Sequence, residues 1–281
     1  MEKKMSIRSK ICMYILLTVI AVIFMFPLIW MVVSSFKDDA GIFSDISGIR
    51  AFLPSFHADV FFNYKEVLAR IPLAKAMLNS FSYIVVAILA GLIVNSMAGY
   101  AFARLKFPGK NIIFSILIAV MVIPAQTVML PQFSIIYKLG LADSYTALIL
   151  PAIASPMYIF LFRQNFLGIP ESIEEAAKLD GASALRTFFQ LIVPLAKPIY
   201  ATVTILVFIA MWNDFVWPVM FISDTNKQTI QMALSSLFSI SPVNYGNVMA
   251  GLTIVTIPVL ILFLLLQKYY VAGIASTGAK N

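Results

Sequence analysis

The chain has 281 residues, of which 61% are hydrophobic and 12% charged, whereas a soluble domain has about 45–50% apolar and about 25% charged residues. A water-soluble core cannot hide this much apolar surface, so the composition indicates that most of the chain lies in lipid. The single cysteine, Cys12, excludes a disulfide framework and a Cys-based metal site, and the single histidine, His57, excludes a His-cluster metal site. The net charge of +7 raises the question of which side of the membrane the basic residues face.

Six apolar stretches are long enough to cross a bilayer, which takes about 20 residues each. They predict an all-α membrane protein with six transmembrane helices at approximately 11–35, 76–102, 112–130, 145–162, 199–221 and 248–266. The first stretch is too long for the apolar region of a signal peptide, and no clear small-residue cleavage site follows it, so we expect a retained helix.

The basic residues indicate the orientation of the six spans. If the N-terminus is cytoplasmic, 13 of the 20 Lys and Arg residues lie inside, and five of the remaining seven fall in one long external loop at about 36–75. The positive-inside rule therefore predicts that both termini are cytoplasmic. Within the external loop, a short helix with weak amphipathic spacing is expected at 64–70 and could lie on the membrane surface.

The loop between the fourth and fifth spans carries most of the information. Ser172 and Glu175 have the spacing of a capping box, and the early acidic residues Glu171 and Glu174 suit the positive end of a helix dipole. Gly181 is placed to end this helix in a left-handed conformation. The sequence therefore predicts a short acidic helix that stops at a sharp turn.

A second short helix is expected after this turn, with Ser183 as its N-cap. Its expected buried face consists of Leu185, Phe188, Phe189 and Ile192, and Pro194 and Pro198 would limit its continuation. A helix–glycine–helix elbow with an acidic, small-residue surface suits docking into a groove of a partner. The residues alone fit an amphipathic connector between two spans equally well.

The elbow resembles the EAA motif of ABC-importer permeases, which reads E-A-A, then D-G-A, then an apolar residue before a proline. Here the pattern is carried by Glu175, Ala176, Ala177, Asp180, Gly181, Ala182, Ile192 and Pro194. Further resemblance at 78–80, 99–109, 212–218 and 273–278 is to the binding-protein-dependent carbohydrate-uptake family, whose members include the six-span permease subunit of the maltose transporter.

This resemblance implies the type I (MetI-like) permease fold. It divides the chain into residues 1–71 with the first span and external loop, a permease core at 72–267 with the EAA loop at 165–198, and a cytoplasmic tail at 268–281. It also implies that the chain is one permease subunit of an ATP-driven importer in the bacterial cytoplasmic membrane, with a sugar, in particular an oligosaccharide, as its cargo and no nucleic acid among its partners. The EAA residues would couple the pathway to a separate ATPase by alternating access.

The partners implied by the resemblance are a second homologous permease, two ATP-binding subunits, an extracytoplasmic sugar-binding protein, the lipid bilayer and a small-molecule sugar. No cofactor is expected in this chain, because ATP and magnesium would be bound by the ATPase. The segment Gly109-Lys110-Asn111 lacks the glycine spacing and the Ser or Thr of a phosphate-binding loop. We expect no catalytic residue and no metal site, so the chain is not predicted to be an enzyme.

The fifth span is the best candidate for contact with substrate. Val207, Ala210, Met211 and Asp214 follow the i, i+3, i+4, i+7 spacing of one helical face, and Trp212 and Asn213 adjoin them. Asp214 is an ionisable residue within a predicted span, which makes it a functional candidate, and Trp212 or Trp217 could cover a sugar ring. Alternatively, Asp214 binds only a neighbouring helix and Trp217 belongs to the interfacial aromatic belt.

Two other classes of function are weaker readings of the sequence. A stand-alone secondary transporter would need an ion site, for which Asp214 alone gives little support. A membrane enzyme would need a catalytic constellation, and the sequence contains no paired intramembrane carboxylates, no HExxH and no GxSxG pattern.

Overall fold

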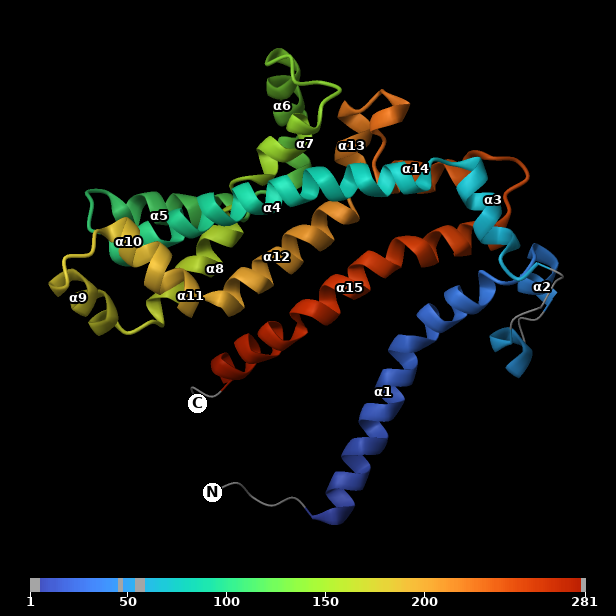
Figure 1. Cartoon of the computed structure of the whole chain (residues 1–281), viewed down its shortest axis with the longest axis horizontal. Coiled ribbons are helices and arrows are strands. Elements are labelled where there is room, and N and C mark those ends of the chain that lie inside the picture. Colours follow the sequence, from blue (N-terminus) through green and yellow to red (C-terminus); the bar gives the residue numbers. More distant parts are fainter. Residues whose placement is uncertain (1–5, 45–47, 54–58, 279–281) are drawn as a thin grey trace. The chain divides into compact units, whose positions relative to one another are not determined.

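The computed structural model describes the backbone of residues 6–44, 48–53 and 59–278, and the side chains of these apart from 49–50 and 269–278. Throughout this part of the chain the regular structure is helical (Figure 1), so the all-α prediction is confirmed. His57 and the last three residues of the predicted tail lie outside the described residues.

Three unbroken helices are long and apolar enough to cross a membrane. They are α1 (Ile7–Ser34), α4 (Leu73–Arg104) and α15 (Tyr245–Gly278). Three bent pairs raise the number of spans to six if each pair is one span. These are α5 (Lys110–Val120) with α6 (Ala125–Lys138), bent by 103°, α7 (Tyr145–Ala152) with α8 (Pro156–Leu167), bent by 42°, and Ala184–Leu195 with α12 (Lys197–Trp212), bent by 79°.

The shorter elements connect these helices. They are α2 (Asp39–Ser44), η1 (Ile49–Phe52), α3 (Phe62–Arg70), α9 (Glu171–Leu179), α10 (Ala184–Thr187), the π-helical turn η2 (Phe188–Ile192), α11 (Val193–Leu195), α13 (Val216–Phe221), η3 (Thr225–Lys227), α14 (Ile230–Ser236) and η4 (Leu237–Ser239).

Three of the predicted spans are interrupted within their apolar stretches. Proline explains two of the breaks, since Pro124 precedes α6 and Pro156 begins α8, and a proline disfavours helical backbone in the residue before it. The span predicted at 199–221 stops at Trp212, because Asn213 and Asp214 adopt the turn that separates α12 from α13. The third, fourth and fifth predicted spans are therefore present as helices that are bent or broken within the predicted range.

The chain divides into two compact units, Met1–Ala74 with Ala233–Ile257 and Lys75–Met232 with Pro258–Asn281. In the first unit, the short helix predicted at 64–70 is confirmed as α3. Its Val67 is fully buried, and Asn63 Nδ2 donates hydrogen bonds to Ser35 O (2.9 Å) and Lys37 O (2.7 Å). The inner face of α3 therefore packs on the protein rather than on a membrane surface.

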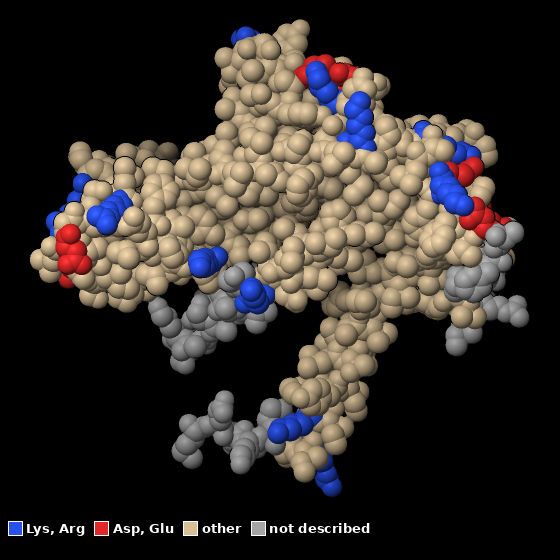
Figure 2. Space-filling model, in the orientation of Figure 1, with Lys and Arg blue, Asp and Glu red and all other residues tan. Residues whose placement is uncertain are grey.

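Helix α1 buries none of its most apolar window against the described part of the chain. Its apolar side chains, among them Phe24 at 76% exposed, are available to lipid or to another subunit. On the face that Figure 2 shows, most of the surface is uncharged, and the charged side chains form small separate groups.

In the second unit, α4 and α8 cross in close contact at Gly99. A Cβ at this position would lie 2.6 Å from Phe162 Cβ, so the crossing requires a residue without a side chain. Phe162 and Phe166 on α8 are fully buried. The elbow and the α12 face predicted from the sequence both belong to this second unit.

Candidate functional site

The predicted elbow is present as two short helices separated by a glycine. We use the word elbow for residues 171–192, which comprise α9, the turn at Gly181, α10 and η2. Gly181 has φ +77°, as expected for the left-handed residue that ends a helix. Ser183 caps α10 by accepting a hydrogen bond from Arg186 N at 3.3 Å, which confirms its predicted role.

Two details of the predicted elbow are wrong. Ser172 does not cap α9, because the helix begins at Glu171 after Pro170 and Ser172 already lies within the first turn. The predicted apolar face of the second helix is only half buried: Phe188 and Ile192 are buried, whereas Leu185 and Phe189 are 59% and 51% exposed. The π-helical turn η2 changes the helical register, so four residues at α-helical spacing cannot all face inward.

The outer surface of the elbow carries the residues of the predicted docking motif. Glu175, Ala176 and Asp180 are exposed, Ala182 is partly exposed, and Ala177 is buried at 7% exposure. A shallow hollow of ≈ 160 Å³ opens between the two helices, and it is lined by Ala177, Asp180, Ala182, Arg186, Thr187, Gln190 and Leu191. The structure thus brings together the acidic and small residues on one accessible surface.

An ion pair fixes the elbow to the last turn of α4. Arg104 Nε lies 2.6 Å from Glu174 Oε1, and the two side chains are only 8% and 17% exposed. Arg104 Nη1 lies 3.2 Å from Glu171 Oε1, but that carboxylate is 77% exposed. Tyr100 OH donates to Glu174 Oε2 at 2.9 Å. Because a partly buried pair is poorly screened by solvent, Glu174 is the principal acidic partner of Arg104.

Aromatic rings fill the space beneath this ion pair. The Tyr100 and Phe188 ring centroids are 5.0 Å apart, and Tyr100 and Phe166 meet edge to face at 6.1 Å. These rings come from α4, η2 and α8, three elements that are distant in sequence. Close aromatic packing of this kind holds the inner face of the elbow in one position.

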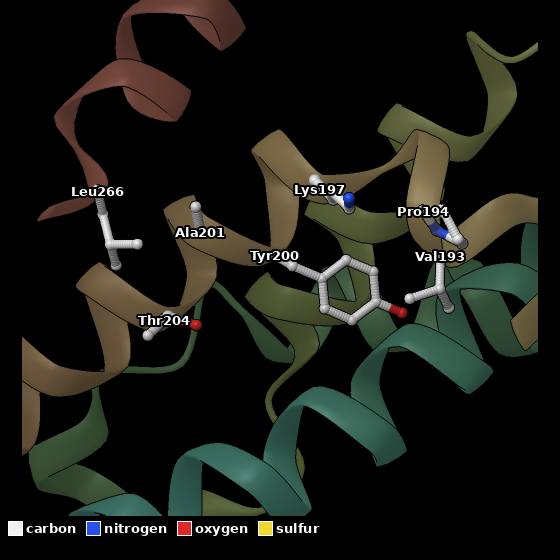
Figure 3. A pocket seen from close by; sticks show the side chains of 7 residues that line it. All are labelled: Val193, Pro194, Lys197, Tyr200, Ala201, Thr204 and Leu266. Atoms are coloured by element: carbon white, nitrogen blue, oxygen red, sulfur yellow. The ribbon is translucent and has the colours of Figure 1, made fainter.

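Pro194 lies where the elbow meets α12. It lines a hollow of ≈ 450 Å³ whose walls are Val193, Pro194, Lys197, Tyr200, Ala201, Thr204 and Leu266. Figure 3 shows Val193 and Pro194 beside Tyr200 at one end of this hollow and Leu266 of α15 near Ala201 at the other. The lining is mainly apolar, with Lys197 exposed at the first turn of α12.

The predicted substrate face of α12 is divided by the structure. Val207 and Trp212 are buried at 5% and 1% exposure, and Trp212 stacks on Phe208 at 5.2 Å. Ala210 and Asn213 are exposed, and Asn213 Nδ2 donates to Ile209 O at 2.9 Å. These four side chains do not line the cavity into which Met211 and Asp214 open.

Met211 and Asp214 share a cavity of ≈ 340 Å³ that we call the polar hollow. It is lined by Ala125, Gln126, Met129, Gln132, Leu148, Pro151, Ala152, Met211, Asp214, Val216 and Trp217. Asp214 Oδ1 accepts a hydrogen bond from Trp217 N at 3.2 Å, and Trp217 Nε1 donates to Ala147 O at 3.2 Å. The carboxylate of Asp214 and the amides of Gln126 and Gln132 therefore line one cavity whose other walls, Trp217 among them, are mainly apolar, and this combination suits sugars.

A polar contact joins the loop before α7 to the loop after α13. Asp143 Oδ1 accepts hydrogen bonds from the backbone N–H groups of Ser223 (3.0 Å) and Asp224 (3.1 Å), and Lys227 Nζ lies 3.4 Å from Asp143 Oδ2. The hydrogen bonds from the Asp224 and Ser223 backbone lower the pKa of the Asp143 carboxyl below its usual value of 3.8. This contact supports the α6–α7 and α13 segments that border the polar hollow.

Several residues of the site could not be assigned from the sequence. Gln126 and Gln132 lie beyond the break at Pro124, and Arg104 pairs with Glu174 across 70 positions of the chain. Arg104 does stand out as the only charged residue in the last turn of α4. Across the described residues, no group of three or more His, Cys, Asp or Glu side chains could hold a metal ion.

Comparison with known proteins places these features in a family. A family model described as "Binding-protein-dependent transport system inner membrane component" matches residues 84–276. The permease protein AraQ of the arabinooligosaccharides transport system of Halalkalibacterium halodurans is 36% identical over 203 residues, which cover 72% of this chain and 73% of that protein. The lactose transport system permease LacG of Rhizobium radiobacter is 30% identical over 263 residues, which cover 94% of both chains.

A solved structure is similar over almost the whole length. A chain from the crystal structure of a bacterial ABC transporter involved in the import of the acidic polysaccharide alginate superposes with a TM-score of 0.80 and 27% identity. The match covers 95% of this chain and 99% of that chain. The elbow and the polar hollow both fall inside the segment that the family model matches.

Proposed function

The chain belongs to the family of binding-protein-dependent transport system inner membrane components, and from this premise we propose that it is the permease subunit of an ATP-driven oligosaccharide importer. It forms half of the translocation pathway and couples through the elbow to an ATPase carried by a separate subunit. The carbohydrates named for AraQ, LacG and the alginate importer support a saccharide as the cargo.

The observation that carries the coupling role is the exposed crown of the elbow. Glu175 and Asp180 are exposed beside Ala176, so a partner can approach the helix backbone closely. A basic residue in the cleft of an ATPase would pair with Glu175, and the left-handed Gly181 gives the turn its small radius. In this role Ala177, Ala182 and Pro194 shape the docking surface and its connection to α12 rather than contact nucleotide.

The polar hollow is the proposed contribution of this chain to the sugar pathway. Asp214, Gln126 and Gln132 offer hydrogen-bond partners for sugar hydroxyls, and Trp217 and Met211 offer apolar surface. Trp217 rather than Trp212 is the tryptophan that can cover a sugar ring, since Trp212 is buried against Phe208. In this arrangement Val207 and Trp212 pack α12 against the rest of the chain, and Ala210 and Asn213 are exposed on its surface.

The complete transporter that we propose contains a second, homologous permease, two ATP-binding subunits and an extracytoplasmic sugar-binding protein. The excess of basic residues on the elbow side favours cytoplasmic termini and a cytoplasmic elbow in the bacterial inner membrane. ATP-driven closure of the ATPases would move the two elbows and expose the pathway alternately to the two sides. Family membership favours this function over a stand-alone secondary transporter.

The coupling role is tested by reversing the charge at the crown of the elbow. We expect Glu175→Lys to leave membrane insertion and subunit assembly intact and to abolish ATP-driven uptake of radiolabelled arabino-oligosaccharides and lactose, measured in proteoliposomes with the partner subunits. Gln164→Lys introduces the same side chain at an exposed position on α8 outside the elbow and serves as the control. Normal uptake by Glu175→Lys, in a complex that transports either probe, would overturn the assignment.

A further inference from the structure

The guanidinium of Arg104 directs its contacts to one small region of the second unit. Nε and Nη1 lie beside the carboxylates of Glu174 and Glu171, and Nη2 donates to the backbone carbonyls of Phe166 (2.8 Å) and Ile169. These acceptors lie at the end of α8, in the following turn and in the first turn of α9. A planar guanidinium with five N–H groups can hold three backbone segments in one fixed geometry, which a lysine cannot.

The same helix α4 is held to the break between α7 and α8 closer to its middle. Asn95 Nδ2 donates to Ile153 O at 2.8 Å, and Asn95 Oδ1 accepts from Ser155 N at 2.8 Å. Between Asn95 and Arg104, α4 approaches α8 so closely at Gly99 that a Cβ there would lie 2.6 Å from Phe162 Cβ. The elbow end of α4 is thus fixed to α8 at several successive levels, and Arg104 extends this attachment to α9.

The opposite end of α4 contacts the segment that borders the polar hollow. Tyr83 OH donates to Met211 O at 3.2 Å, and Asn79 Nδ2 donates to the Gln228 carbonyl at 3.0 Å. The 21 positions between Tyr83 and Arg104 correspond to about 30 Å of continuous helix. One continuous helix therefore joins Arg104, which binds the elbow, to Tyr83, which contacts the backbone of Met211. The side chain of Met211 lines the polar hollow.

Building on the proposed function, we propose that Arg104 is the positioning residue that makes the elbow and α4 move as one body, so that displacement of the elbow reaches the polar hollow through α4. The ion pair with Glu174 and the hydrogen bonds from Arg104 to the Phe166 and Ile169 carbonyls make this connection, without contact to sugar or nucleotide. Displacement at one site can reach a distant site through a continuous element that contacts both, and α4 is that element here.

The two carboxylates that pair with Arg104 differ in their solvent exposure, and therefore in how firmly they hold the elbow. Glu174, at 17% exposed, also accepts from Tyr100 OH, whereas Glu171 is 77% exposed and solvent screens its pairing with Arg104. Arg163 is a matched cation on α8. Its Nε donates to Phe102 O on α4 and its guanidinium lies over the Phe114 ring, and neither contact involves the elbow. Loss of Glu171 or Arg163 should therefore spare the attachment of the elbow.

The experiment measures the attachment directly in the assembled transporter. Spin labels are placed at Leu89→Cys on α4 and Leu179→Cys on α9, both exposed positions, in a Cys12→Ser background with cysteine-free partner subunits. Pulsed electron resonance then gives the distance between the labels without nucleotide and with ATP trapped. We expect one narrow distance that nucleotide does not change, and a broadened or nucleotide-dependent distance in Arg104→Gln and in Glu174→Gln.

The controls and a second readout make the result decisive. Arg163→Gln and Glu171→Gln should keep the narrow distance. In Arg104→Gln, uptake of arabino-oligosaccharide or lactose probe per ATP hydrolysed should fall by about five-fold or more, with the ATPase rate changed far less, since coupling free energies correspond to factors of about 5–150. If Arg104→Gln does not assemble, the label distance and the uptake per ATP hydrolysed in Glu174→Gln test the proposal instead.

A narrow, nucleotide-independent distance in the variants would overturn the proposal, because the elbow would then be fixed to α4 without Arg104. An equal loss of uptake and ATP hydrolysis would also overturn it, because the ion pair would then serve only folding or assembly. Failure of the coupling function is a separate result: Glu175→Lys would transport normally while the label distances still responded to Arg104→Gln.

Discussion

Asn95 on α4 pairs with Ser155, which immediately precedes α8, by accepting its backbone N–H at 2.8 Å. The same side chain donates to Ile153 O, so one amide satisfies a backbone carbonyl and a backbone N–H at the break between α7 and α8. Asn95 is 1% exposed. A buried amide at this place replaces the hydrogen bonds that a bent span loses in an environment without water.

Replacing this amide should destabilise the protein. Asn95→Leu keeps the size of the side chain but leaves the Ser155 N–H and the Ile153 carbonyl unpaired, so the free energy of unfolding should fall by about 1–3 kcal/mol. The thermal unfolding midpoint of the detergent-solubilised complex measures this. Ser82→Ala removes an exposed hydroxyl from the same helix and should change stability by less than about 0.5 kcal/mol; equal effects of the two substitutions would contradict the role of Asn95.

Two glycines of α4 should respond differently to the addition of one methyl group. In Gly99→Ala the new Cβ would lie 2.6 Å from Phe162 Cβ and 3.0 Å from Arg163 N, which forces α4 and α8 apart. We expect a loss of about 1–3 kcal/mol in stability, typical of overpacking. At Gly91 the nearest atom to a Cβ is Ile153 O at 3.5 Å, so Gly91→Ala should be tolerated.

The same thermal unfolding measurement compares the two variants. Alanine is also the better helix former, by about 1 kcal/mol, so Gly91→Ala should be neutral or stabilising. If Gly99→Ala unfolds at the same temperature as Gly91→Ala, the crossing of α4 and α8 is looser than the structure indicates.

The contact between Asp143 and the loop after α13 should depend on pH. Backbone hydrogen bonds from Asp224 and Ser223 lower the pKa of Asp143 in the folded protein below its usual 3.8. A lowered pKa means that the contact is fully present above the usual value and is lost as the pH falls through the folded value. The loop should therefore be intact at neutral pH and loosen in the acid range below 3.8.

Hydrogen–deuterium exchange at Ser223 and Asp224 tests this expectation, with exchange rates corrected for the chemical effect of pH. Protection of the two amides should decrease on acidification in the wild type. Asp143→Asn, which has no charge to lose, should show weaker protection and no acid transition. A transition that persists in Asp143→Asn would assign the pH dependence to another group.

Asp214 and Asn213 are neighbours that should differ in their effect on uptake. Asp214 lines the polar hollow, whereas Asn213 is exposed and bonds to Ile209 O within α12. Loss of one hydrogen bond of about 1 kcal/mol corresponds to a several-fold weaker interaction. Asp214→Ala should therefore raise the KM for transported arabino-oligosaccharide or lactose several-fold, with normal assembly, and Asn213→Ala should leave it unchanged.

The same comparison separates the two interpretations of Asp214. If Asp214 only begins α13 by accepting the Trp217 N–H, its replacement should lower stability and leave the KM of the assembled complex as in the wild type. That result would remove Asp214 from the sugar pathway.

The elements that local chemistry controls could be predicted from the sequence. The left-handed turn at Gly181, the cap at Ser183 and the short helix α3 all follow from residue types that act within one or two turns of the chain. The continuous apolar runs gave the correct regions of α1, α4 and α15. The predicted capping of α9 by Ser172 is wrong because the helix begins at Glu171, directly after Pro170, so that Ser172 already lies inside it.

The features that depend on distant parts of the chain could not be predicted. Pro124 indicates a bend, but the 103° angle between α5 and α6 depends on what each half packs against. The pairing of Arg104 with Glu174 and the convergence of Gln126 and Gln132 on Asp214 join segments that no local pattern relates. Helical spacing placed Val207 and Asp214 on one face, but the turn after Trp212 removes Asp214 from that face.

Because of the π-helical turn at Phe188–Ile192, the orientation of the elbow depends on the number of residues in this segment, whatever their side chains are. Deleting one residue here would restore α-helical spacing and rotate everything before it by about 100° relative to α11. The crown with Glu175 would then face a new direction although every residue of the docking motif was still present. The number of residues between Gly181 and Pro194 therefore sets the direction in which the elbow faces, and a single insertion or deletion there would change that direction.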